Sequence, residues 1–149
     1  MRLSTKARYG TRAMLDLALG YGKGPISLRE VAKRQEISEK YLEHLIVSLK
    51  SAGLVKSIRG THGGHLLAKP PSQIRLDEVV RVLEGSLVPV ECVDDPSFCR
   101  RVRFCVTRDI WGEVKEAMEG VLKSTTLQDL VERQKEKERE QCGGTMYYV

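Results

Sequence analysis

The chain has 149 residues, enough for one ordinary domain or a small domain with an appendage. No apolar run is long enough to span a bilayer, and charged residues interrupt the apolar residues near the N-terminus, which argues against a signal peptide. We therefore expect a cytoplasmic protein, in which four cysteines indicate metal or redox chemistry rather than a disulfide framework.

The net charge of +5 is unevenly distributed along the chain. Residues 1–69 contain 13 Lys/Arg and 5 Asp/Glu, whereas residues 70–149 contain 12 and 15. A basic half joined to a mildly acidic half indicates a polyanion-binding module fused to a second functional segment. The charge distribution by itself does not distinguish this interpretation from a basic face that is exposed to solvent and binds no partner.

The first half predicts three helices followed by a β-hairpin. Apolar residues recur at helical spacing, between glycines and capping residues, in residues 4–21, 27–35 and 38–53. Two short apolar runs, residues 54–58 and 65–68, then flank a basic tip rich in glycine, which is the pattern of a hairpin. This order is typical of a winged helix-turn-helix, in which the third helix enters the major groove of DNA.

Candidate DNA contacts lie at three places along this module. Base readout is expected from the start of the third helix, at Ser38, Glu39, Lys40, Tyr41, Glu43 and His44. The wing would contact the DNA backbone or minor groove through Arg59, Gly60, Thr61, His62, Gly63 and Gly64. The positive end of the first helix would hold another phosphate through Ser4, Thr5 and Lys6. Such modules also bind proteins, but the basic excess and the polar recognition face favour DNA.

The second half predicts a short helix, a loop, and a long helix. Residues 75–85 have helical periodicity, whereas residues 86–106 have no clean period and carry three of the four cysteines. Thr107 is expected to cap a long helix with a continuous apolar stripe, followed by a short helix that ends at residue 131. Alternating charges without apolar residues predict that the tail, residues 132–149, is disordered.

The predicted fold class is mainly α with a small β-hairpin wing. We divide the chain into a winged helix-turn-helix DNA-binding domain (1–85), a cysteine-bearing loop (86–106), a dimerisation helix with a short terminal helix (107–131) and a charged tail (132–149). The chain is too short to cover the stripe of the long helix, so a homodimer is expected. Its interface would contain Ile110, Trp111, Val114, Met118, Val121 and Leu122.

The loop cysteines, Cys92, Cys99 and Cys105, are too widely spaced for the common cysteine motifs. Structural zinc sites use closer pairs, and both bacterial ferredoxin clusters and thioredoxin-type dithiols use C-x-x-C. A flexible loop could still fold three thiols around one inorganic centre. Four nearby arginines would then favour thiolates and offset the charge of an anionic iron–sulfur core.

Several motifs resemble the Rrf2 family of bacterial transcription regulators: "SLREVA", "YLE", "AGLVKSIRG…GG…L" and "VLEG". The resemblance covers about residues 1–131. It implies a homodimeric regulator, such as a repressor, that binds a near-palindromic double-stranded operator. The motifs "PVEC…C…CVTRDIW" and "TTLQDLV" are similar to the branch of iron–sulfur cluster regulators. That branch implies a [2Fe–2S] cluster on Cys92, Cys99 and Cys105, control of cluster-biogenesis genes, and cluster-assembly proteins as further partners.

The fourth ligand of such a cluster is left open by the sequence. Arg108 stands where relatives often place a histidine, and a guanidinium has no lone pair to give. The candidates in this chain are Glu91, Asp94, Asp95, Asp109 and Cys142. A residue of the partner subunit or a small exogenous ligand could also serve.

Two related functions remain as alternatives. One is a nitric-oxide-sensing repressor with a [4Fe–4S] cluster on the same cysteines. The other is a cluster-free member of the family that responds to a metabolite or protein partner. An enzyme is not expected, because the sequence contains no nucleotide-binding loop, no C-x-x-C and no Ser/His/Asp set.

Overall fold

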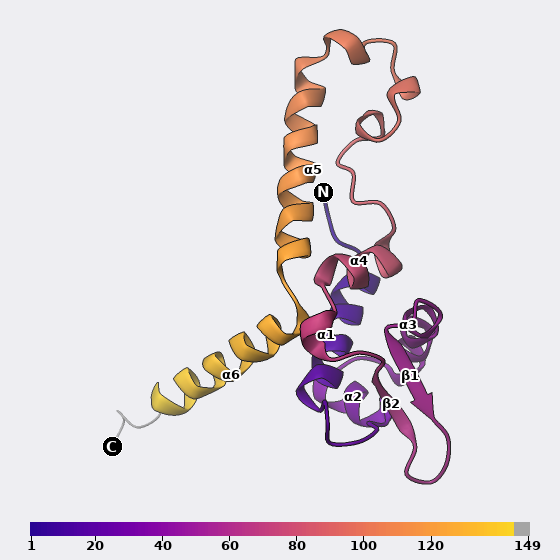
Figure 1. Cartoon of the computed structure of the whole chain (residues 1–149), viewed down its shortest axis with the longest axis vertical. Coiled ribbons are helices and arrows are strands. Elements are labelled where there is room, and N and C mark those ends of the chain that lie inside the picture. Colours follow the sequence, from indigo (N-terminus) through magenta and orange to yellow (C-terminus); the bar gives the residue numbers. More distant parts are fainter. Residues whose placement is uncertain (145–149) are drawn as a thin grey trace.

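The computed structural model describes residues 1–144 and contains one winged-helix body with two projecting helices (Figure 1). The body consists of α1 (Thr5–Leu19), α2 (Leu28–Gln35), α3 (Glu39–Ser51), β1 (Val55–Ile58), β2 (Gly64–Leu67) and α4 (Leu76–Glu84). The projecting helices are α5 (Val106–Ser124) and α6 (Leu127–Gly144), which leave the body in different directions. The predicted fold class is confirmed.

Serine side chains begin the first three helices. Ser4 and Ser38 each accept a hydrogen bond from a main-chain N–H of the first turn that follows. Ser27 forms the predicted capping box with Glu30. Each such cap satisfies a free N–H group and stabilises its helix by about 1 kcal/mol. The helix starts are therefore determined locally, as the sequence predicts.

The two strands form an antiparallel hairpin in which Val55 pairs with Leu67 and Ile58 with Gly64. The segment that precedes α2 adds one bridge, between Ile26 and His65. A Cβ atom on Gly64 would lie 2.6 Å from the main-chain oxygen of Ile26, so only glycine allows this approach. The wing is thus fastened to the helix-turn-helix at its base.

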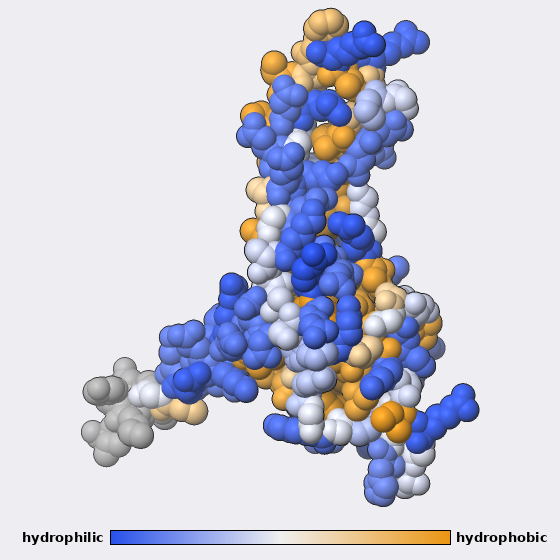
Figure 2. All heavy atoms as spheres, in the orientation of Figure 1, coloured by the Kyte–Doolittle hydropathy of each residue, from blue (hydrophilic) through white to orange (hydrophobic). Residues whose placement is uncertain are grey.

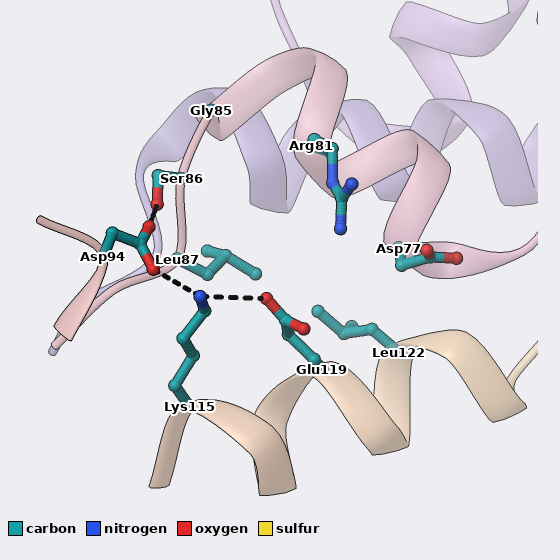
Figure 3. A pocket seen from close by; sticks show the side chains of 9 residues that line it. All are labelled: Asp77, Arg81, Gly85, Ser86, Leu87, Asp94, Lys115, Glu119 and Leu122. Carbon is teal, nitrogen blue, oxygen red and sulfur yellow. Dashed lines mark hydrogen bonds and ion pairs between the residues drawn. The ribbon is translucent and has the colours of Figure 1, made fainter. Parts of the chain in front are cut away.

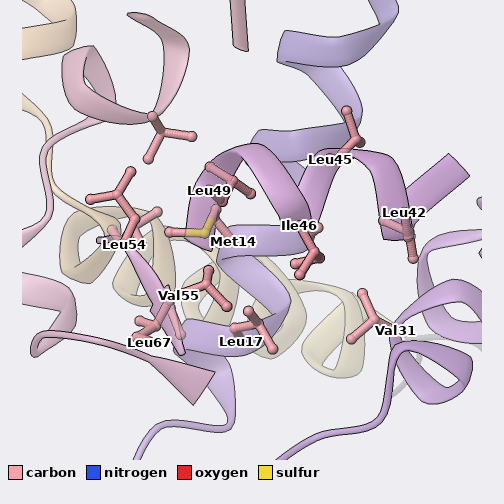
Figure 4. Close-up of a cluster of buried hydrophobic side chains, with 14 of the residues drawn as sticks. Met14, Leu17, Val31, Leu42, Leu45, Ile46, Leu49, Leu54, Val55 and Leu67 are labelled. Atoms are coloured by element: carbon pink, nitrogen blue, oxygen red, sulfur yellow. The ribbon is translucent and has the colours of Figure 1, made fainter. Parts of the chain in front are cut away.

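The core of the body lies between α1, α2, α3 and the hairpin (Figure 4). Met14 and Leu17 of α1 meet Leu49 of α3 there, and all three are at least 98% buried. The first turns of α6 close the core with Leu127 and Val131. Burying an aliphatic side chain of this size contributes about 1.5–3 kcal/mol, so α6 is anchored to the body by its N-terminal end.

The prediction of a disordered tail is wrong for residues 132–144, because α6 continues to Gly144. Polar side chains four residues apart support this helix: Gln128 donates to Glu132, and Gln134 donates to Glu138. Residues 145–149, the rest of the predicted tail, lie outside the described residues.

The other differences from the sequence are small. Helix α5 begins at Val106 with Cys105 at its N-cap position, so Thr107 is not the cap. The cysteine loop contains three single 3₁₀ turns: Glu91–Val93, Pro96–Phe98 and Val102–Phe104. Among residues 1–144, no helix has the length and apolar character needed to cross a membrane.

Candidate functional site

The recognition helix α3 divides cleanly into a buried and an exposed face. Its apolar face is buried at Leu42, Leu45, Ile46 and Leu49. Lys40, Glu43 and His44 are exposed on the other side, where three- and four-residue spacing places them on one face. Val47 continues that face and is 63% exposed. Val47 was not among the predicted contacts, although an apolar residue outside the buried set of this helix could have indicated an exposed contact.

The remaining predicted residues of α3 have structural contacts. Ser38 caps the helix, and Glu39 is exposed in its first turn. Tyr41 is half-buried, with its ring edge-on to Tyr9 of α1 at a centroid distance of 6.0 Å. Arg12 of α1 lies over the face of Tyr9, 5.5 Å from the centroid. A cationic and aromatic cluster thus supports the end of α3 that would enter the groove.

The wing presents its basic tip to solvent. Arg59, Thr61 and His62 are exposed, and the turn is closed by a hydrogen bond from Gly63 N to Gly60 O of 3.0 Å. The φ angle of +116° at Gly60 lies in the region that favours glycine. This tip is compact, with bare main-chain groups that a phosphate backbone can approach.

The N-terminus of α1 does not offer a free anion site. The main-chain N–H and the hydroxyl of Ser4 both donate to the carboxylate of Glu84, at the end of α4. Thr5 and Lys6 are exposed. An intramolecular carboxylate therefore takes the position proposed for a phosphate, and the DNA contacts of Ser4, Thr5 and Lys6 stay predictions.

A buried ion pair fixes the angle between the first two helices. Asp16 of α1 is 4% exposed and accepts three hydrogen bonds from the guanidinium of Arg34 and one from Gln35, both in α2. The hydrogen bond from Arg34 to Asp16 raises the pKa of the guanidinium. This contact orients α2 against α1, and no local sequence pattern predicts it.

The three loop cysteines are free and half-buried, but the structure does not bring them together. Among residues 1–144, no three His, Cys, Asp or Glu side chains are grouped to hold one metal ion. The chemistry of these residues nevertheless fits an iron–sulfur cluster. All three are free thiols, and they lie in one loop whose regular structure is limited to three short 3₁₀ turns. A hydrogen bond with the hydroxyl of Thr107, and a second one with the main-chain N–H of Arg108, lower the pKa of the Cys105 thiol. The lower pKa favours the thiolate, which is the form that binds a metal.

The candidate fourth ligands differ in availability. Asp94 is held by Lys115 and Ser86, and Asp95 accepts hydrogen bonds from Ser97. Glu91 and Asp109 are exposed at the two ends of the loop. Cys142 lies near the free end of α6, far from the loop (Figure 1). Cys142 is therefore not placed to join the loop cysteines within one chain.

Arg108, which lacks the chemistry of a ligand, holds the main chain of the loop. Its Nε donates to the carbonyl of Cys92 over 2.8 Å, and its Nη2 donates to the carbonyl of Val93 over 3.3 Å. These contacts connect the first turn of α5 with the segment that carries the first cysteine. From the sequence, Arg108 was expected only to supply positive charge near the thiols and to be unable to act as a ligand, so its contacts with the loop main chain were not predicted.

A polar cavity of about 340 Å³ separates α4, the loop and α5 (Figure 3). Lys115 of α5 points into it and contacts both Asp94 of the loop and Glu119 one turn further along α5. Asp94 also accepts a hydrogen bond of 2.9 Å from Ser86. The loop is thus attached to the winged-helix body and to α5 beside its first cysteine.

Helix α5 leaves its apolar stripe uncovered. None of its described residues is buried, and the exposed fractions are 53% at Ile110, 37% at Trp111 and 65% at Val121. Val114, Met118 and Leu122 are half-buried. Apolar side chains are visible at the surface along α5 and at the end of the loop (Figure 2). An exposed stripe of this kind fits an interface with a second helix.

The three-helix unit, the exposed polar recognition face and the glycine-tipped wing define a winged-helix DNA-binding transcription regulator. The chain belongs to the Rrf2 family, whose model, described as "Iron-dependent Transcriptional regulator", matches residues 3–133.

The relatives include proteins named CymR and proteins named IscR. The chain is 44% identical to the HTH-type transcriptional regulator CymR of Bacillus subtilis (strain 168), over 87% of this chain and 89% of the relative. The solved structure of that protein, titled the global cysteine regulator, covers 89% of this chain and 98% of its own with a TM-score of 0.77. The chain is also 40% identical to IscR of Klebsiella pneumoniae (strain 342), with coverage of 90% and 82%. The structure of T. potens IscR is 44% identical, with a TM-score of 0.77 and coverage of 92% and 90%.

Proposed function

We propose that this regulator binds a near-palindromic operator in the cytoplasm as a homodimer, and that an iron–sulfur cluster on its cysteine loop controls the affinity. The observation that carries the proposal is the position of three free thiols in one loop, attached at its base to both the DNA-binding body and α5. Similarity to the IscR proteins supports the cluster, and the target genes would then be those of cluster biogenesis.

Sequence would be read by the exposed face of α3. Lys40 can donate to guanine, and Glu43 can accept from the amino group of cytosine while repelling phosphates at wrong sites. Val47 adds methyl groups at the next turn of the same face, where they can contact the methyl of a thymine. Arg59 would bind phosphate in a way that does not depend on sequence.

Dimerisation would use the exposed stripe of α5 that includes Ile110, Trp111 and Val121. Two-fold symmetry would then place the recognition helices about 34 Å apart, one turn of DNA, which suits a near-palindromic site. Arg108 and Lys115 of the same helix contact the loop, so α5 would carry both the dimer interface and the attachment of the cluster segment.

Cys92, Cys99 and Cys105 would hold the cluster, and an acidic residue, a partner residue or an exogenous ligand would complete it. When bound, a [2Fe–2S] group would supply redox chemistry and sensitivity to iron supply. The chain's own residues would order the loop, favour the thiolate at Cys105 and attach the loop base to α5.

The test is anaerobic purification followed by a visible spectrum and analysis of iron and acid-labile sulfide. We expect about two irons and two sulfides per chain, and loss of the absorption in Cys92→Ser, Cys99→Ser and Cys105→Ser proteins. Cys142→Ala is the matched control and should keep the absorption. Full absorption in Cys99→Ser protein would overturn the ligand assignment, and four irons per chain would favour the nitric-oxide-sensing alternative.

A second candidate is a cluster-free regulator that responds to a metabolite or protein partner. Two observations favour it: the separation of the loop thiols within the described residues, and the similarity to CymR, titled a cysteine regulator. Protein purified without iron or sulfide that still binds its operator tightly, and that gains nothing from cluster reconstitution, would support this candidate over the first.

A further inference from the structure

Two cationic side chains of α5 hold three consecutive residues of the cysteine loop. Arg108 donates to the carbonyls of Cys92 and Val93 over 2.8 and 3.3 Å, and Lys115 pairs with the carboxylate of Asp94. Arg108 and Lys115 are seven residues apart, about two helical turns, so both lie on one face of α5. We call these contacts the loop clamp.

The loop clamp is also connected to the segment that directly follows α4. Ser86, which follows the end of α4, donates a 2.9 Å hydrogen bond to Asp94. Glu84, the last residue of α4, accepts hydrogen bonds from Ser4 at the start of α1. Because Ser86 and Glu84 are close neighbours along the chain, these contacts connect α5 and the loop base to the end of α4 and, through Ser4, to the start of α1.

Other arginines of the loop show that charge alone does not create such contacts. The side chains of Arg100, Arg101 and Arg103 are exposed and make no hydrogen bond or ion pair with any residue that the structure describes. Arg108 is half-buried, and its acceptors are neutral carbonyls rather than carboxylates. Its function is therefore geometric, and it uses the planar fork that lysine does not possess.

We propose that Arg108 is a positioning residue, which fixes the main chain at Cys92 against the first turn of α5, and that Lys115 completes the clamp at Asp94. The clamp holds Cys92 close to the start of α5, where Cys105 lies at the N-cap position. Only the segment between Cys92 and Cys105 would then have to fold around a bound group. This inference rests on the proposed function for its purpose, because it takes Cys92 as a ligand.

The first experiment uses full-length, reduced, cluster-free protein and follows alkylation of each cysteine by iodoacetamide with mass spectrometry. Loss of a nearby positive charge slows alkylation, because the thiolate becomes scarcer. Loss of the clamp exposes Cys92 and accelerates its alkylation. Arg108→Ala should therefore raise the rate at Cys92, by roughly three- to tenfold for the loss of about one net hydrogen bond. Arg100→Ala is the matched control for charge and should give no increase.

Hydrogen exchange gives a second readout on the same proteins. The amides of residues 93–95 donate to the carbonyls of Val90 and Glu91 within the first turn of the loop. Arg108→Ala and Lys115→Met should each accelerate exchange at these amides. Arg108→Lys should not restore protection. Circular dichroism should show the same helix content in all variants, since the clamp lies outside the hydrophobic core.

The outcomes separate the clamp from the cluster. Equal alkylation at Cys92 and equal exchange at residues 93–95 in Arg108→Ala and Arg100→Ala proteins would overturn the clamp, whatever the wild type binds. Accelerated alkylation together with cluster loading equal to wild type would overturn the positioning role of Arg108. A wild-type protein without visible absorption after reconstitution would overturn the proposed function instead, while the alkylation difference would still report the clamp.

Discussion

The guanidinium of Arg34 donates from Nη2 to Oδ1 of the buried Asp16 over 2.6 Å and from Nε to Oδ2 over 3.0 Å. This contact joins α2 to α1 and orients the helix-turn-helix. Arg34 itself is about half exposed, whereas the carboxylate is almost completely buried. Removing Arg34 would leave the buried carboxylate of Asp16 with Gln35 as its only side-chain donor among residues 1–144, so the two partners contribute unequally.

Arg34→Ala should lower the free energy of unfolding by about 1–3 kcal/mol, the cost of leaving a buried acceptor largely unsatisfied. Asp16→Asn combined with Arg34→Ala should recover part of that loss. Arg29→Ala, an exposed arginine of the same helix, is the control and should change stability by less than about 0.5 kcal/mol. Urea denaturation measures all three, and equal effects of Arg34→Ala and Arg29→Ala would argue against the buried pair.

Arg59 and Glu43 should affect DNA binding in different ways. Arg59→Ala should weaken binding to all sequences and reduce the slope of log affinity against log salt by about one. Glu43→Ala should leave that slope nearly unchanged and broaden the set of selected sequences, because it removes a repulsive group. In-vitro selection and salt titrations distinguish them; an unchanged slope for Arg59→Ala would remove this residue from the interface.

Val47 should contact a thymine methyl if the exposed face of α3 lies in the major groove. Replacing thymine by uracil, one position at a time in a selected operator, should weaken wild-type binding about fourfold at one position of each half-site, the value of one buried methyl group. Val47→Ala protein should show no such penalty at that position. A uracil scan identical for both proteins would contradict the contact.

His65 should make the fold sensitive to mild acid. Its Nδ1 is buried and has no hydrogen-bond partner among the described residues; burial, and then the charge of Lys50, lower its pKa below the ordinary value near 6.5. The neutral form is thus favoured in the fold, and stability present above about pH 6.5 is lost as the pH falls towards the folded pKa. His65→Gln should flatten this loss in urea denaturation between about pH 7.5 and 5.5. An unchanged pH dependence would exclude His65 as its source.

Local patterns were sufficient to predict the body of the fold. Caps at Ser4, Ser27 and Ser38, the helical apolar periods and the glycine-rich turn are each encoded within a few residues. The start of α6 was predicted, but its continuation beyond residue 131 was not, because its anchors, Leu127 and Val131, lie in the core and outside the charged segment.

Contacts between residues far apart in the chain could not be predicted from local sequence patterns. Ser4 is an ordinary cap by local criteria, but its other partner, Glu84, is 80 residues away. Arg108 likewise gains its role from a segment 15 to 16 residues earlier. From its chemistry alone, Ser4 was predicted to contact a phosphate and Arg108 to be unable to bind the cluster. In the structure Ser4 contacts Glu84, and Arg108 contacts the main chain at Cys92 and Val93. The convergence of the three cysteines stays a prediction.

The proposed function requires that the state of the cysteine loop controls DNA affinity. Its most direct test is an anaerobic titration of one selected operator duplex, at fixed salt, with cluster-loaded and cluster-free protein. Differential ordering of the loop base should change the affinity by about 5–150-fold, equivalent to about 1–3 kcal/mol. Equal affinities of the two forms, for every operator that binds at all, would contradict the account.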